Sequence, residues 1–305
     1  MERKKLGWTG EEISPLILGT FEHGVRTLVS EEEAVKLLNR AIELGINAFD
    51  TAESYGKGES ERVLGKVIKG VKRDEVFLIT KVSPEHLRYD DVLKSAERSM
   101  RRLDVSYIDL YLVHWPNHYV PLRETAKAME KLVNDGKVRY VGVSNFSLPL
   151  LREFREHLSR TDVAADEVHY NLLFRAIEEE VYPYASREGI PILAYDPLGL
   201  GYLVGRREIR DEYRWYFLAK DGVVEALAPL VEEVRKTAER LGLTPAQVLL
   251  GWLTSKELVF PVFNTTKQKH LEENVGFRET PLDAIQSLES ISTKVWLDLR
   301  SKELV

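Results

Sequence analysis

The sequence contains no cysteine, so it can form neither a disulfide framework nor a thiolate metal site. It also lacks an excess of basic residues, because 43 Lys and Arg stand against 49 Asp and Glu, a formal net charge of -6. This charge balance gives no reason to expect a nucleic acid or an anionic membrane as a partner. A small molecule is the favoured partner, and no metal site is expected.

Long apolar stretches are missing as well. No run approaches the ~20 apolar residues of a membrane span, and the first residues, MERKKLGWTG, lack the apolar core of a signal peptide. We therefore expect a cytoplasmic protein. The chain has three Gln and 30% charged residues, a composition that hints at a hot environment.

Low-complexity segments are also missing, since no Pro-, Gly- or Ser-rich tract and no block of like charge interrupts the 305 residues. With 44% hydrophobic residues the chain can bury a large core, which excludes a disordered or fibrous protein. We expect residues 1–305 to form a single domain.

Short β-branched runs alternate with amphipathic helical stretches along the whole chain. Eight strands are predicted, at residues 14–20, 46–51, 75–81, 107–114, 138–144, 164–170, 190–196 and 258–263. One predicted helix opens with a capping box from Ser30 to Glu33. The others are predicted at about 58–70, 90–103, 122–136, 147–160, 178–189, 222–242 and 267–276. Apolar strands covered by helices indicate parallel strands, and eight such units close into a barrel.

A doubly wound open sheet is the structural alternative. Its usual dinucleotide fingerprint, G-x-G-x-x-G after the first strand, is absent, because the first predicted strand ends in LGTFEHG. We therefore predict an α/β fold, a (β/α)8 TIM barrel with additional loops and a C-terminal helical tail. The surplus residues are a leading segment 1–13, an insert 197–221 and a tail 279–305.

Chemically reactive side chains stand where predicted strands end. Asp50, Lys81 and His114 each end a strand, and Tyr55 lies in the loop after the second strand. In a barrel these positions meet at the carboxyl-terminal rim, where the active site of this fold is built. A nearby ammonium favours a phenolate and lowers the pKa of a phenol from about 10 toward neutrality, so Tyr55 is a candidate general acid.

The other three residues have complementary roles. Asp50 is expected to keep the Lys81 ammonium charged and oriented, and an uncharged His114 to donate a hydrogen bond to a substrate oxygen. A single polar residue at a strand end is more often a cap or a satisfied rim group. Four compatible residues on three successive βα units favour catalysis.

These residues stand within motifs that resemble those of the aldo-keto reductase family. The resemblance covers nearly the whole chain, through GINAFDTAESYGKGESERVLGK, ITK, SMRRLDVSYIDLYLVHWPN, LVNDGKVRYVGVSNF, HYNLLFR, AYDPLGLGYL and TPAQVLLGWL. It implies the reversible, NAD(P)H-dependent reduction of an aldehyde or ketone, in which hydride goes to the carbonyl carbon and Tyr55 protonates the oxygen. It also implies that Asp50 and Lys81 tune Tyr55 and that His114 positions the carbonyl.

The resemblance also implies where the cofactor and the substrate lie. Ser144 and Asn145 are expected to bind the nicotinamide carboxamide, with Glu167 beside them, and Tyr195 to stack on the ring. The remaining cofactor contacts are expected from Thr20, Leu198, Gly199, Leu200, Gly201, Asn264, Thr265, Thr266, His270, Glu273 and Asn274. The substrate pocket is expected to be lined by Phe21 and Trp115, with Asn117, His118, Tyr213, Trp215, Tyr216 and Phe217 above it.

Three departures from the family pattern affect the cofactor site. Glu167 stands where Gln is common, and an ionised carboxylate accepts hydrogen bonds but cannot donate one. Asp196 follows the stacking Tyr where a small residue is usual, so it would repel a pyrophosphate unless it turns away or finds a cation. Asn264 and His270 stand where a Lys and an Arg often grip the 2'-phosphate. NADP(H) is expected, with NAD(H) as an alternative.

Several alternatives stay open. Lys267 and Lys269 lie near a predicted helix N-terminus that favours anions, or they are solvated surface residues. Lys81 at a strand end also fits a Schiff-base aldolase, although an ion pair with Asp50 would keep its proton in place. A cofactor-binding regulatory subunit with little turnover is a further possibility. The carbonyl substrate and the oligomeric state are left open, with a monomer favoured.

Overall fold

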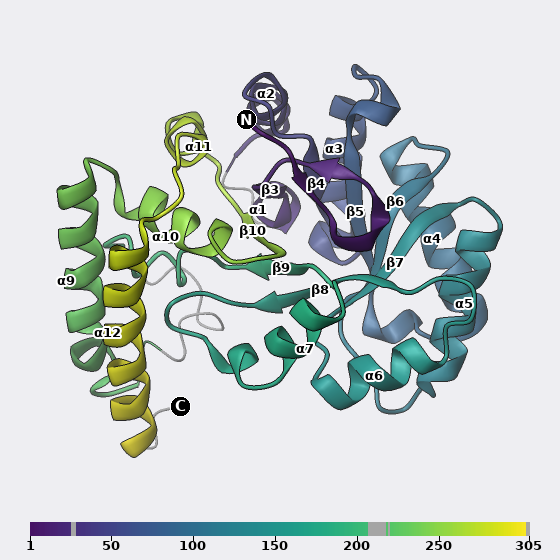
Figure 1. Ribbon diagram of the computed structural model, residues 1–305. Coiled ribbons are helices and arrows are strands. Elements are labelled where there is room, and N and C mark those ends of the chain that lie inside the picture. The colour runs from purple at the N-terminus through teal and green to yellow at the C-terminus, as the bar shows by residue number, and fades with distance from the viewer. Residues whose placement is uncertain (26–28, 207–217, 219, 303–305) are drawn as a thin grey trace.

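The computed structural model describes residues 1–25, 29–206, 218 and 220–302. Eight of the described strands form a closed parallel barrel at the centre of the molecule (Figure 1). They are β3 (Ile17–Gly19), β4 (Ala48–Asp50), β5 (Phe77–Val82), β6 (Ile108–Val113), β7 (Val138–Ser144), β8 (Val163–His169), β9 (Ile192–Tyr195) and β10 (Val259–Phe263). The ring closes where β10 pairs with both β9 and β3. The predicted (β/α)8 barrel is confirmed, and each predicted strand is present.

Helices connect the strands and cover the outside of the barrel (Figure 1). They are α1 (Phe21–Val25), α2 (Glu31–Glu43), α3 (Glu59–Ile68), α4 (Tyr89–Leu103), α5 (Leu122–Asn134), α6 (Leu148–Glu156), α7 (Val181–Arg187), α10 (Pro245–Thr254) and α11 (Gln268–Val275). The predicted capping box opens α2: Ser30 Oγ accepts from the Glu33 amide at 3.3 Å, and the Ser30 amide donates to the Glu33 carboxylate at 2.9 Å. These paired hydrogen bonds satisfy amides that the first helical turn leaves free.

The predicted helical tail is present and fixes a loop near the barrel rim. α12 (Leu282–Ser301) packs along α9 (Val223–Leu241), and the two lie side by side at one edge of the molecule (Figure 1). From α12, Ser292 Oγ donates to the Leu172 carbonyl at 2.6 Å, and Arg175 donates back to the Glu289 carbonyl at 3.0 Å. None of the described helices has both the length and the apolar character that a membrane crossing requires.

The leading segment forms a hairpin that the sequence did not predict. β1 (Lys4–Lys5) pairs antiparallel with β2 (Glu12–Ile13). Leu6 and Ile13 are buried against side chains inside the barrel, among them Phe77 and Phe260 near the starts of their strands. The hairpin therefore closes the amino-terminal mouth of the barrel and leaves the carboxyl-terminal rim open.

Candidate active site

A cavity of about 770 Å³ opens at the carboxyl-terminal ends of the barrel strands. Most of the site residues predicted from the sequence line it. They are Phe21, Asp50, Tyr55, His114, Trp115, Ser144, Asn145, Glu167, Tyr195, Leu198, Leu200, Gly201 and Asn264. Lys81 lies beneath them, fully buried at the cavity floor.

Asp50 and Lys81 form a buried ion pair at this floor. Asp50 pairs with Ile79 in the register of β4 and β5, so Lys81, two residues further along β5, faces the same interior side. Lys81 Nζ donates to both Asp50 carboxylate oxygens and, at 3.0 Å, to the Thr51 carbonyl.

The electrostatics of the pair keep Lys81 charged. Burial alone would lower the pKa of Lys81, but Asp50 and Glu167 raise that pKa by more, so it lies above its ordinary value. Burial raises the pKa of Asp50, and the Lys81 ammonium opposes that shift. A permanently protonated Lys81 agrees with the expected role of a fixed positive charge.

Tyr55 lies directly over this charge. Its hydroxyl is 3.4 Å from Lys81 Nζ. The Tyr55 ring meets Phe21 edge-on at a centroid distance of 5.0 Å and His114 at 5.6 Å. These contacts hold the phenol between the ion pair and the cavity.

The expectation that Lys81 brings the pKa of Tyr55 toward neutrality is wrong for this structure. Burial raises the pKa of the phenol above its ordinary value, and Lys81 offsets only part of that shift. The physical reason is that Asp50 already neutralises Lys81, so little net positive charge acts on the hydroxyl. A phenol with a raised pKa stays protonated, which is the state that a proton donor needs.

His114 is uncharged, as expected. Burial, followed by repulsion from Lys81, lowers its pKa to about 3. Its Nδ1 lies 3.4 Å from Ser54 Oγ, and its ring lines the cavity beside Tyr55. A neutral imidazole can donate one hydrogen bond into the cavity without changing the charge there.

A second group of polar side chains lies on β7, β8 and β9. Ser144 Oγ donates to the Glu167 carbonyl at 2.8 Å. The side-chain Nδ2 of Asn145 donates to the His114 carbonyl at 3.1 Å, and Tyr195 Oη donates to Asn145 Oδ1 at 2.9 Å. Asn145 has φ of 62°, in the left-handed region that Asn tolerates. These hydrogen bonds therefore fix the side-chain amide of Asn145 between His114 and Tyr195.

The comparison with known proteins identifies the family of this chain. Residues 15–292 match the model of the aldo/keto reductase family. The chain belongs to this family. Membership makes it a nicotinamide-dependent oxidoreductase, and the rim cavity is its candidate active site.

Relatives of this reductase support the same assignment. It is 32% identical over 287 residues to a methylglyoxal reductase of Escherichia coli (strain K12), covering 94% of this chain and 93% of the relative. It resembles the solved thermostable aldo-keto reductase Tm1743, with 35% identity, a TM-score of 0.81 and coverage of 95% and 100% of the two chains. It also resembles an aldo-keto reductase from Klebsiella pneumoniae solved with NADP and acetate, with 30% identity, a TM-score of 0.77 and 96% coverage of each chain.

Asp196 in the reductase is held by neighbours that the sequence did not reveal. Its Oδ2 lies 3.0 Å from His169 Nε2, and the Leu200 amide donates to its two oxygens at 2.9 and 3.0 Å. The His169 ring also stacks on Tyr195, with centroids 5.1 Å apart. Asp196 thus caps the loop that carries Leu198 to Gly201, so its lone pairs are engaged by the protein itself.

Some predicted cofactor residues do not line the cavity. The Thr20 hydroxyl donates to the Asp50 carbonyl at 2.9 Å and lies 2.7 Å from Ser60 Oγ, fully buried behind the rim. Thr265 exchanges hydrogen bonds with the Lys267 backbone. The others outside the lining are Gly199, Thr266, His270, Glu273 and Asn274.

Arg206 is a cavity residue that the sequence analysis missed. Its amide donates to the Gly201 carbonyl at 3.0 Å, which closes a turn after the Leu198–Gly201 loop. The side chain packs so closely on this turn that a Cβ at Gly201, where φ is 76°, would lie 3.1 Å from Arg206 Cδ. No strand or helix pattern marks the residue, and a basic side chain shortly after a glycine-containing loop was the available signal.

The predicted substrate residues Phe21 and Trp115 line the cavity, with Trp115 49% exposed at its mouth. Asn117 instead stabilises a turn, because its side chain donates to the Pro84 carbonyl at 2.8 Å and accepts from the Tyr119 amide at 3.0 Å. The four aromatic residues expected above the pocket, Tyr213, Trp215, Tyr216 and Phe217, lie outside the described residues.

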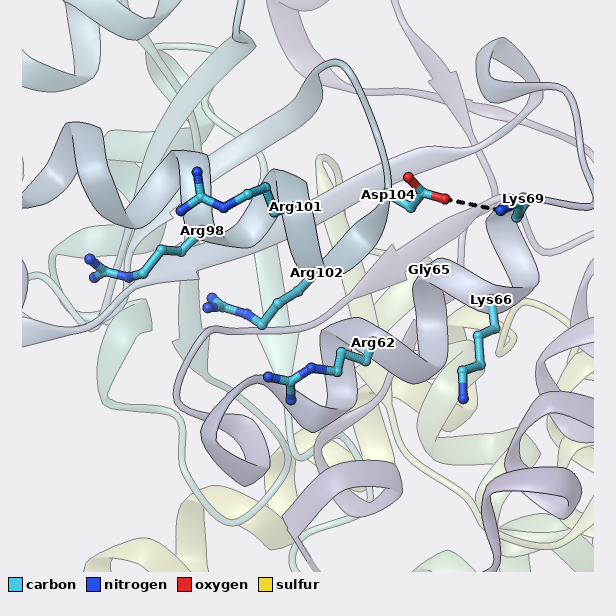
Figure 2. A pocket seen from close by; sticks show the side chains of 8 residues that line it. All are labelled: Arg62, Gly65, Lys66, Lys69, Arg98, Arg101, Arg102 and Asp104. Carbon is cyan, nitrogen blue, oxygen red and sulfur yellow. Dashed lines mark hydrogen bonds and ion pairs between the residues drawn. The ribbon is translucent and has the colours of Figure 1, made fainter.

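A second concavity, on the outer surface between α3 and α4, is strongly basic (Figure 2). Its basic side chains are Arg62, Lys66, Lys69, Arg98, Arg101 and Arg102. Five of these groups pair with acidic side chains at 2.5 to 3.7 Å, namely Arg62 with Glu59, Lys66 with Glu31, Lys69 with Asp104, Arg98 with Glu53 and Arg102 with Glu61. Because these cations are largely neutralised, the surface is a solvated ion-pair network. Among the described residues, no three His, Asp or Glu side chains are grouped as a metal site requires.

Proposed function

We propose that the reductase transfers hydride from NADPH to the carbonyl carbon of an aldehyde or ketone while Tyr55 donates a proton to the oxygen. The observation that carries the proposal is the Tyr55 side chain, which lines the rim cavity and holds its hydroxyl 3.4 Å from a buried ammonium. The hydride and the proton together add two electrons and two hydrogen nuclei, which converts the carbonyl to an alcohol. Tyr55 is left as a phenolate, stabilised by Lys81 until a proton from water restores it.

The residues of the cavity fit a nicotinamide cofactor. Asn264 Oδ1 and Glu167 Oε2 are buried and accept no hydrogen bond from any described residue. Both belong to residues that line the cavity, and a ligand bound there is the partner that we propose for these buried oxygens. Asn145 and Glu167 are proposed to hold the carboxamide, and Tyr195 the face of the ring. When bound, the cofactor supplies the hydride.

His114 is proposed to position the substrate. As a neutral ring beside Tyr55, it donates to the carbonyl oxygen and directs that oxygen toward the phenol. Phe21 and Trp115 give the cavity an aromatic wall, which suits small apolar or aromatic aldehydes and also sugars. A panel of these carbonyl compounds, assayed by oxidation of NADPH, tests the proposed reaction.

A Schiff-base aldolase fits the site poorly. The Lys81 amine is held protonated by Asp50 and has no exposed surface, so it is not available as a nucleophile. Borohydride in the presence of an aldehyde substrate is expected to leave Lys81 unmodified, as measured by the intact mass of the protein.

We expect the protein to discriminate only weakly between NADPH and NADH. Asn264 in the cavity and exposed His270 on α11 replace a Lys and an Arg, so we expect NADPH to be preferred over NADH within about tenfold, or ~1.4 kcal/mol, at pH 8. The measurement is the ratio of dissociation constants at pH 6 and at pH 8, in wild type and Asn264→Lys. A hundredfold ratio at both pH values, unchanged by the substitution, would show that other residues grip the phosphate.

Arg206 is proposed to attract the cofactor's phosphates. We expect Arg206→Ala to weaken NADPH and NADH alike, because the Leu198–Gly201 loop next to it is expected to face the pyrophosphate that both cofactors share. The loss should be at least tenfold and should shrink at high salt. Arg101→Ala, on the basic outer surface, is the matched control and should bind both cofactors as the wild type does. Unchanged affinities in Arg206→Ala would remove this residue from the cofactor site.

A further inference from the structure

Glu167 is a second buried carboxylate beside Lys81. In the register of β8 it pairs with Ser144 on one side and Leu193 on the other, which turns its side chain to the barrel interior. Oε1 lies 3.4 Å from Lys81 Nζ, and the side chain is only 4% exposed. Oε2 has no hydrogen-bond partner among the described residues. Glu167 thus lines the cavity and carries a buried oxygen that no described residue satisfies.

Asp50, Glu167 and Lys81 carry a net negative charge if both carboxylates are ionised, because the single ammonium balances only one of them. Lys81 Nζ donates to the two Asp50 oxygens and the Thr51 carbonyl, and it also lies 3.4 Å from Glu167 Oε1 and from the Tyr55 hydroxyl. Glu167 therefore shares a single ammonium with Asp50, and its Oε2 accepts from no described donor. A buried carboxylate in this position lowers its free energy by taking up a proton.

The charged groups around Glu167 act in the same direction. Burial and then Asp50 raise the pKa of Glu167 to about 8, against the attraction of Lys81. Asp166, the preceding residue, is also fully buried, and neither of its oxygens has a partner among the described residues. Tyr55 stays a neutral phenol, so it brings no positive charge to the cluster. Lys81 is the one cation near Glu167 among these groups, and Asp50 has already engaged it.

We propose that Glu167 holds a proton at neutral pH and binds the carboxamide of the cofactor as a carboxylic acid, so that loss of this proton weakens cofactor binding. The inference rests on the proposed function, because it concerns the same nicotinamide cofactor. A primary carboxamide offers a donor and an acceptor, which a carboxylic acid complements on both sides, whereas a carboxylate only accepts. The chain thereby reaches, by protonation, the hydrogen-bonding capacity that the Gln common in the family has at every pH.

The proton makes cofactor affinity depend on pH with a defined sign. Below the pKa of Glu167 the acid form is present and binding has its full strength. Above it, the dissociation constant for NADPH should rise by up to tenfold per pH unit, until binding through the carboxylate form takes over. Lys81 and Tyr55 have raised pKa values and His114 is neutral throughout, so these three groups do not cause this rise. Burial and then Glu167 also raise the pKa of Asp166, but Asp166 remains in Glu167→Gln, so a rise caused by Asp166 would persist in that variant.

The test is a titration of the full-length protein with NADPH, followed by nicotinamide fluorescence between pH 6 and pH 9.5. We expect the wild-type dissociation constant to rise above pH 8 and that of Glu167→Gln to stay flat. Glu85→Gln, an exposed acid, is the matched control and should follow the wild type. 2'-Phospho-ADP-ribose lacks the carboxamide, so its dissociation constant should change with pH in the same way in the wild type and in Glu167→Gln.

The outcomes separate this inference from the proposed function. Equal pH dependence in wild type and Glu167→Gln, or a flat wild-type profile, would overturn the inference while leaving reductase function intact. Absence of NADPH binding at every pH would overturn the proposed function instead.

Protein stability gives an independent readout, because at Glu167 the folded chain holds a proton that the unfolded chain has released above the ordinary pKa of 4.5. The wild type should therefore lose stability relative to Glu167→Gln as pH rises from about 4.5 to 8, and parallel profiles would contradict a protonated Glu167.

Discussion

Replacement of Tyr55 by phenylalanine is expected to lower carbonyl reduction by about 10² to 10⁴-fold, the usual cost of removing a general acid. The Tyr55 ring contacts Phe21 and His114 edge-on, and phenylalanine preserves both contacts. The substitution removes only the hydroxyl over Lys81. The dissociation constant for NADPH should therefore stay within a fewfold of the wild type, and the loss should appear in kcat.

Tyr119→Phe is the matched control, because that phenol is 91% exposed and lies outside the cavity lining. It should reduce every carbonyl substrate at the wild-type rate. Wild-type turnover in Tyr55→Phe with several aldehydes would show that the proton comes from another group.

Replacement of Lys81 by methionine is expected to damage both activity and stability. Without the ammonium, Asp50 and Glu167 lose the cation near both of them, and breaking a buried pair typically costs about 3 to 5 kcal/mol. Lys81 lowers the pKa of Tyr55, so its removal makes the phenol a weaker acid. Reduction should fall almost as far as in Tyr55→Phe. In the reverse direction, alcohol oxidation needs the phenolate, so its rise with pH should shift to higher pH.

A charge-balanced double variant separates the two effects of Lys81. Asp50→Asn together with Lys81→Met leaves no unpaired charge at Asp50, so it should recover part of the free energy of unfolding while remaining inactive. Lys131→Met, which breaks an exposed pair with Asp135 on α5, is the surface control and should cost no more than ~0.5 kcal/mol. A double variant with wild-type turnover would show that the pair only supports the fold.

The barrel and most of its rim were predictable from the sequence, because both follow from patterns among residues that are close together along the chain. Each strand is a short apolar run between helices, and the polar residue that ends it must lie at the rim. For this reason the sequence predicts Asp50, Lys81 and His114 at the carboxyl ends of three neighbouring strands, and the pairing of β4, β5 and β6 agrees with that prediction. The roles assigned to them by resemblance to the family stay predictions until the variants are measured.

Elements without such a pattern were missed. The strands of the leading hairpin have two residues each, too short for a periodic signal. α10 is buried on nearly all sides, including Trp252, so it has no polar face to reveal a helical period. Arg206 lies in an irregular turn, where position depends on hydrogen bonds to the backbone.

Electrostatic properties were the least predictable, because they depend on burial and on distant partners. The ammonium of Lys81 was expected to acidify Tyr55, but Asp50 neutralises it and burial dominates. Asp196 was expected to repel a pyrophosphate unless it turned away or found a cation, and the sequence did not reveal its contacts with His169, 27 residues earlier in the chain, and with the Leu200 amide. Neither effect is visible in the spacing of the residues.

The most direct measurement is a single-turnover reaction of enzyme saturated with NADPH and mixed with an aromatic aldehyde, in wild type and in Tyr55→Phe. Stopped-flow absorbance reports the loss of reduced nicotinamide, and product analysis reports the alcohol. The proposed mechanism predicts that the wild type oxidises one NADPH per active site and forms one alcohol, while the variant, equally loaded with cofactor, reacts at least about 10²-fold more slowly. A wild type that binds NADPH but leaves it unoxidised with every aldehyde and ketone tested would contradict catalysis and support a cofactor-binding regulatory subunit.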